Sequence, residues 1–109
     1  MSYDVALGVR VKGRWYEIVE VGNMTSNVAS MWRLASPDTD GLAGLDTMLA
    51  GEAAKHLSTA VLRMRADPDP YVALSPANGW GSYDGALEFL TQVLKACREH
   101  PWLTVSVDK

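Results

Sequence analysis

The chain has 109 residues, of which 48% are hydrophobic and 21% charged, and its formal net charge is −3. This length predicts one domain over residues 1–109, and the hydrophobic content argues against an intrinsically disordered chain. Because nucleic acids and anionic membranes attract basic surfaces, the acidic balance predicts neither as a partner. The single cysteine excludes an intrachain disulfide, and no apolar stretch approaches the roughly 20 residues of a membrane span. A cytoplasmic protein is therefore expected.

The N-terminal segment predicts a β-hairpin. Residues 3–11 alternate between apolar and other side chains, which is typical of a half-buried strand. Residues 14–21 are rich in β-branched and aromatic side chains, and the two runs are separated by Lys12-Gly13. A two-residue turn that ends in glycine is a common hairpin connection.

The register of this hairpin decides which side chains face the core. If Val11 pairs with Arg14, the core face carries Tyr16 and Ile18. The opposite face then carries Trp15, Glu17 and Val19. Large apolar groups left exposed on one face can mark a protein-binding surface. The alternative is that the C-terminal segment, through Trp102, covers Trp15.

Three helices and a closing strand are expected after the hairpin. Apolar side chains at helical spacing predict helices over 28–35, 47–66 and 83–99, the last one capped by Ser82. Residues 103–107 alternate again and predict a final strand. The order β-β-α-α-α-β predicts an α+β fold, in which about three helices pack on one face of an antiparallel sheet.

The sequence lacks the common catalytic signatures. It contains no P-loop, no Gly-x-Ser-x-Gly elbow, no His-Glu-x-x-His and no Cys-x-x-Cys. Cys97 continues the apolar stripe of the last helix, and the two histidines, His56 and His100, have no ligand spacing. We therefore expect no cofactor, no metal and no catalytic residues. An enzyme with an unfamiliar site stays open, with Asp84 beside Tyr83, or Asp46, as its acid or base.

The glycine-rich segment before the last helix is the candidate binding site. It can be read as a structural turn, in which Trp80 closes the core. It can also be read as a binding loop, because amides at a helix N-terminus attract anions and aromatic rings stack on planar groups. The helix that begins at 25–27 could open on the same side. The binding hypothesis then involves Thr25, Ser26, Asn27 and Trp32 together with Asn78, Gly79, Trp80, Gly81, Ser82 and Tyr83.

Three segments together resemble a family of small bacteriophage and prophage proteins of unassigned activity. They are Thr25-Ser26-Asn27-Val28-x-x-Met31-Trp32, Asn78-Gly79-Trp80-Gly81-x-Tyr83-x-Gly85-Ala86-Leu87 and Ala96-Cys97-Arg98-x-His100-Pro101. The resemblance covers nearly the whole chain. It implies a phage product that acts in the host cell cytoplasm, and it supplies no mechanism.

Two functions follow as hypotheses. The first is a non-catalytic phage accessory protein that binds a host protein or associates with itself. The second is a binder of a small anionic or nucleotide-like ligand at the two helix starts. A role as a virion component also stays open.

Overall fold

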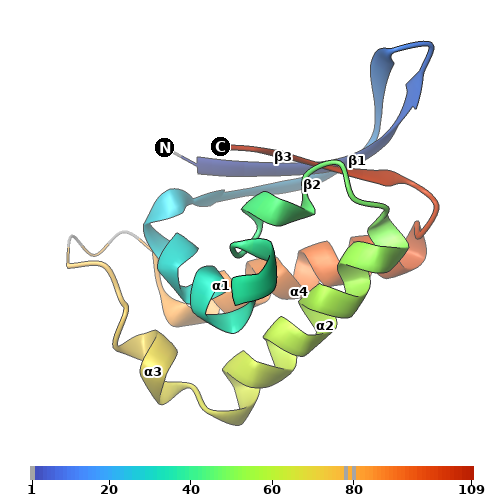
Figure 1. Ribbon diagram of the computed structural model, residues 1–109. Helices are drawn as coiled ribbons and strands as arrows, with labels where there is room; N and C mark the ends of the chain where they lie inside the picture. Colours follow the sequence, from blue (N-terminus) through green and yellow to red (C-terminus); the bar gives the residue numbers. More distant parts are fainter. Residues whose placement is uncertain (1, 78, 80) are drawn as a thin grey trace.

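The computed structural model describes residues 2–77, 79 and 81–109. The described part of the chain forms a three-stranded antiparallel sheet of order β2-β1-β3 and four helices. The strands are β1 (Ser2–Val11), β2 (Arg14–Thr25) and β3 (Thr104–Asp108), and the helices are α1 (Ala29–Ala35), α2 (Ala50–Ala66), α3 (Asp69–Val72) and α4 (Tyr83–Glu99). Figure 1 shows the helices on one side of the sheet. The predicted α+β fold is confirmed.

The core lies between the sheet and the two long helices. The apolar stripe of α4 is buried, as is the stripe of α2 from Ala53 to Met64. On the strands, the inward side chains of β1 and β3 complete the core with Val5, Leu7 and Val105. The 3.6-residue and 2-residue periodicities in the sequence thus correspond to the two layers that face each other.

Short turns connect α1 to α2 and cover one edge of the sheet. Two 3₁₀ turns, Pro37–Thr39 and Ala43–Leu45, lie in this connection, and Leu42 and Leu45 are buried there. The chain then runs along β3. The amide of Thr47 donates to the Val105 carbonyl at 2.8 Å. Because this backbone pairs with β3, α2 begins at Ala50 and not at the expected residue 47.

The pairing of the outer strand β2 with β1 has two irregularities, which change the face of the sheet on which some β2 side chains lie. Val9 pairs with Tyr16 as predicted, but Leu7 pairs with Val19, so that Ile18 is an extra residue in the register. Val19 therefore packs against the core, and its placement on the open face was wrong. Ile18 is 59% exposed instead of buried. A bulge inserts one residue and exchanges the faces of those that follow it, which periodicity alone does not reveal.

The hairpin also extends beyond the helices, as Figure 1 shows at its dark blue turn. Tyr16 shares the face of Val9 but is 46% exposed, because no helix covers this part of the face. The expected burial of Tyr16 was therefore wrong. At the other end, β2 does not stop at residue 21, where the predicted strand-like run ends. The strand continues through Gly22, whose φ of 147° few other residues adopt, to Thr25.

Candidate functional site

The segments that precede α1 and α4, which form the predicted ligand site, lie next to each other. Gly81 has a φ of 94°, and a Cβ built on it would lie 2.7 Å from Val28 Cγ1 and 3.0 Å from Thr25 Cγ2. Glycine thus allows the segment before α4 to pack directly on the segment before α1. Gly79 is exposed with a φ of 74°. Asn78 and Trp80, which were part of the predicted site, lie outside the described residues.

The side chains at these helix starts are used within the fold. Ser82 Oγ accepts a hydrogen bond of 3.0 Å from the amide of Gly85, which confirms the predicted cap. Thr25 Oγ1 accepts from the amide of Asn27 at 3.3 Å. The hydroxyl of Tyr83 donates to the Met64 carbonyl at 2.6 Å and so joins α4 to the end of α2. These contacts favour the structural interpretation of the segment.

Trp32 is a core residue and not an exposed aromatic. Its side chain is 1% exposed, and its Nε1 donates a hydrogen bond of 3.2 Å to the Ala86 carbonyl. The indole meets Tyr3 edge-on, with ring centroids 5.3 Å apart, and lies 5.8 Å from Phe89. Because the apolar ring is enclosed and its single donor is satisfied, Trp32 has no free surface for a ligand. Its inclusion in the ligand site was wrong.

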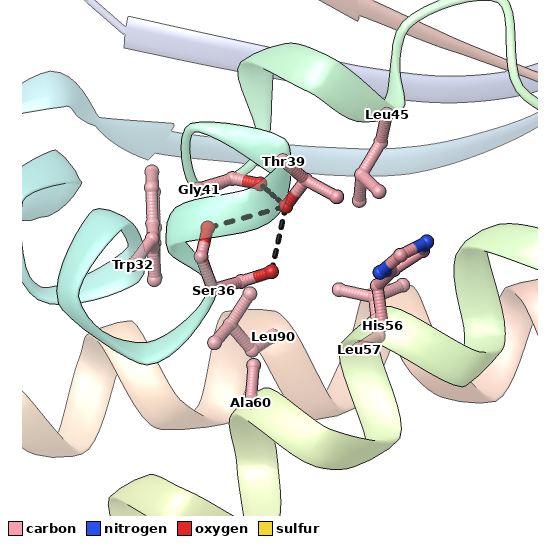
Figure 2. Close-up of a pocket in the computed structure, with 9 residues that line it drawn as sticks. All are labelled: Trp32, Ser36, Thr39, Gly41, Leu45, His56, Leu57, Ala60 and Leu90. Carbon is pink, nitrogen blue, oxygen red and sulfur yellow. Dashed lines mark hydrogen bonds between the residues drawn. The ribbon is translucent and has the colours of Figure 1, made fainter.

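A small hollow between α1, α2 and the 3₁₀ turns is lined by the buried side chain of Thr39. Figure 2 shows the Thr39 hydroxyl bonded to Ser36 Oγ at 2.6 Å and to the Gly41 carbonyl at 2.7 Å. The hollow measures about 10 Å³, which is close to the minimum for one water molecule. His56 lines its far side. Because the hydroxyl is directed at Ser36 and Gly41, this cluster fixes the turn and provides no nucleophile–base pair.

The groups considered for acid–base chemistry also have structural roles. Asp46 Oδ1 accepts a hydrogen bond of 2.9 Å from the amide of Val107 and so protects the edge of β3. Partial burial of Tyr83, assisted by the Asp84 carboxylate, raises the pKa of its hydroxyl above 10.0. Burial raises the pKa of the Cys97 thiol to about 11. These shifts disfavour the reactive anions that catalysis at neutral pH would need.

The helix-free face of the sheet contains the predicted interaction residue Trp15. A Cβ built on Gly8 would lie 2.7 Å from Trp15 Cζ2, so the indole rests on the backbone of the central strand. The Arg10 guanidinium stands 5.9 Å from the ring centroid. Trp102 is 68% exposed, and its ring meets His100, so it is not a buried cover for Trp15. The placement of Trp15 on this face is therefore confirmed, with the ring half-buried.

Two hollows lie along this face. The larger, of about 590 Å³, is lined by Trp15, Arg10 and the side of β3. The smaller, of about 240 Å³, is rimmed by the four acidic residues Asp4, Glu17, Glu20 and Asp108. Both hollows share Ser106 and Asp108, so they form one continuous surface. Glu17 thus belongs to the open face, as predicted.

Sequence reasoning missed the exposed apolar side chains of the projecting hairpin. Val11 is 50% exposed, and Tyr16 and Ile18 accompany it on the same β-ribbon. Their β-branched and aromatic side chains are typical of a core strand. The local sequence does not show that the helices fail to cover this part of the hairpin. The length of the two strands beyond the helical layer is visible only in the tertiary structure (Figure 1).

Comparison of the chain with family models, with curated proteins and with solved structures gives no match. Within residues 2–77, 79 and 81–109, no helix has the length and apolarity required to cross a bilayer. The same residues contain no group of three or more His, Cys, Asp or Glu side chains suited to hold a metal ion.

Proposed function

We propose that this chain is a non-catalytic accessory protein of phage origin that acts by binding another protein, either a host protein or a second copy of itself. The binding surface is the projecting hairpin together with the adjoining helix-free face. The phage origin is supported by the resemblance of the segments at 25–32, 78–87 and 96–101 to small phage proteins.

The exposed apolar side chains of the hairpin carry the proposal. Val11, Tyr16 and Ile18 are about half exposed or more, and they lie on a ribbon that extends away from the helical layer. A folded domain gains little from leaving aromatic and β-branched groups in water, whereas a protein interface is enriched in aromatic groups. Trp15, half-buried on Gly8, presents an aromatic ring on the opposite, helix-free face of the same ribbon.

The chemistry of the rest of the site also favours binding over catalysis. Asp46 and Tyr83 each take part in a hydrogen bond that holds two segments of the chain together, and Thr39 holds its own turn through Ser36 and Gly41. The surface around Trp15 instead combines an aromatic ring, one guanidinium and several carboxylates. Such a mixture matches the polar rim and aromatic centre of a protein interface.

The test is affinity capture from a bacterial host lysate with the wild-type chain and with a Tyr16→Thr/Ile18→Thr variant. Threonine keeps a high strand propensity while it removes apolar surface. The matched control is Leu34→Thr/Leu62→Thr, which removes two exposed apolar side chains from the helices. Light scattering of each purified variant reports self-association in parallel.

We expect the hairpin variant to lose a partner, or to lose self-association, that the helix control retains. The proposal is wrong if the wild-type chain is monomeric and captures no protein that the hairpin variant loses and the helix control retains. Thermal melting of all three proteins establishes that the comparison is made between folded chains.

Binding of an anionic ligand at the two helix starts is the second candidate, favoured by the contact of Gly81 with Val28 and Thr25. It is less well supported, because Ser82 Oγ and Thr25 Oγ1 already accept internal hydrogen bonds. A ligand that binds only the folded state must raise the melting temperature. A nucleotide and phosphate panel that leaves the melting temperature unchanged would remove this candidate.

A further inference from the structure

The two edges of the sheet differ in how their backbone is protected. On the β3 side, the segment Asp46–Ala50 pairs with the strand: Thr47 donates to Val105, and Val105 donates to Met48. On the β2 side, the described residues provide no such cover, since no backbone hydrogen bond outside the hairpin pairing is formed by Arg14–Glu20. A sheet edge without cover is a template for another strand.

The geometry of the hairpin determines which peptide groups point outward. The turn at Lys12 and Gly13 has φ values of 51° and 80°, as in a type I′ turn, and it pairs Val11 with Arg14. In such a hairpin, the two residues that flank the turn form two backbone hydrogen bonds with each other. Non-hydrogen-bonded and hydrogen-bonded pairs then alternate along the two strands. Trp15 and Glu17 therefore direct their N–H and C=O groups away from β1.

The charges on the hairpin are distributed with opposite signs along its length. The positive side chains Arg10, Lys12 and Arg14 lie at the turn, and the negative Glu17 and Glu20 lie towards the sheet. When two copies of such a strand align antiparallel, the positive end of each meets the negative end of the other. A two-fold interface must be complementary to itself, and this arrangement of charge meets that condition.

We propose that a second copy of this chain pairs with the outer edge of β2, antiparallel and about a two-fold axis at Tyr16. This inference rests on the proposed function and names self-association as its mode. Trp15 of each copy then exchanges backbone hydrogen bonds with Glu17 of the other. Tyr16 faces its counterpart, and the positive turn end of each copy, with Lys12 and Arg14, lies towards the negative end of the other, with Glu17 and Glu20.

This register follows from the regular part of the strand. The irregularity at Ile18 interrupts pairing towards the sheet, so Arg14–Glu17 is the regular stretch that has outward peptide groups. The stretch belongs to the part of the hairpin that stands clear of the helices in Figure 1, so a second copy meets no helix there. Because a bulge limits how far an edge can pair, the contact is short and the dimer reversible.

Sedimentation velocity and light scattering over a concentration series test the proposal, up to about 1 mM to include weak association. Two charge-reversed variants are compared: Lys12→Asp/Arg14→Glu at the turn and Glu17→Lys/Glu20→Lys towards the sheet. Aspartate suits the positive φ of position 12. The matched control is Glu52→Lys/Glu99→Lys, two exposed positions on α2 and α4.

We expect the wild-type chain to dimerise, and each reversed variant alone to raise the dimer dissociation constant by about tenfold or more. An equimolar mixture of the two reversed variants should recover dimers, because opposite charges meet again in the heterodimer. The control should associate like the wild type. Slower amide exchange of Trp15 and Glu17 at high concentration identifies the paired edge.

A monomer at every concentration overturns this inference, and so does a dimer that is insensitive to the reversals or is not recovered by mixing. The proposed function and the β2 pairing can be tested independently of each other. If the chain is monomeric but captures a host protein through the hairpin, protein binding stands and β2 pairing falls. If it neither associates nor captures a partner through the hairpin, both fall.

Discussion

Trp15 lies on the backbone of Gly8 so closely that no larger residue fits beneath it. A Cβ at position 8 would stand 2.7 Å from Trp15 Cζ2 and 2.2 Å from the Tyr16 carbonyl oxygen. Glycine within a strand commonly marks such an approach. The contact holds β2 against β1 near the turn of the hairpin, and it therefore connects the stability of the fold with the shape of the proposed binding surface.

Gly8→Ala should destabilise the protein by about 2 kcal/mol, because the methyl group collides with backbone and indole. Urea unfolding measures the loss. Ser106→Ala, on the same face of the neighbouring strand, is the control and should stay within about 0.5 kcal/mol of the wild type. An alanine variant as stable as the control would show that both the Tyr16 carbonyl and the indole can move away without cost.

Trp32→Phe should cost about 2–4 kcal/mol, since it removes both apolar volume and the hydrogen bond to the Ala86 carbonyl. Denaturant unfolding of the variant provides the measurement. Trp102→Phe is the matched comparison, because that indole is largely exposed and its replacement should change the free energy of unfolding by under about 0.5 kcal/mol. Equal losses in the two variants would contradict the buried position of Trp32.

Tyr83→Phe should lower stability at neutral pH by about 1 kcal/mol, because the hydrogen bond to the Met64 carbonyl disappears. The pKa of Tyr83 is raised above 10.0 in the folded state, so the native protein holds this proton more tightly than the unfolded chain does. Stability therefore falls as the pH rises above about 10.

The phenylalanine variant lacks this titration. The difference in stability between wild type and variant should shrink above pH 10, as followed by unfolding at a series of pH values. Cys97 titrates in both proteins, so it cancels from the difference. A gap that widens with pH would reverse the sign and refute the assignment.

Cys97 should react slowly with thiol reagents in the native protein. Burial raises its pKa from 9.0 to about 11, which lowers the thiolate fraction at neutral pH about a hundredfold before steric protection is counted. The rate of labelling by a chromogenic disulfide, measured with and without urea, checks this. Rapid labelling without urea would place the thiol at the surface.

Part of the candidate site could be predicted because it depends on local rules. A Lys-Gly turn between two strand-like runs determines that Val11 pairs with Arg14, and the alternation then places Trp15 and Glu17 on the helix-free face. Ser82 was identified as a cap from its position before an amphipathic helix. Trp32 and Val19 were assigned wrongly, because their burial depends on α4 and on a bulge at Ile18.

The amino-acid sequence alone determined the class of the fold, since the apolar spacing of each segment defines a strand or a helix and the order of the segments defines the layers. The tertiary structure alone decided which parts of the sheet the helices cover. Periodicity specifies the side of a segment that is apolar, but it does not specify how far the opposing layer extends. The exposure of Tyr16 and Ile18 is the consequence, because their part of the hairpin passes the end of that layer.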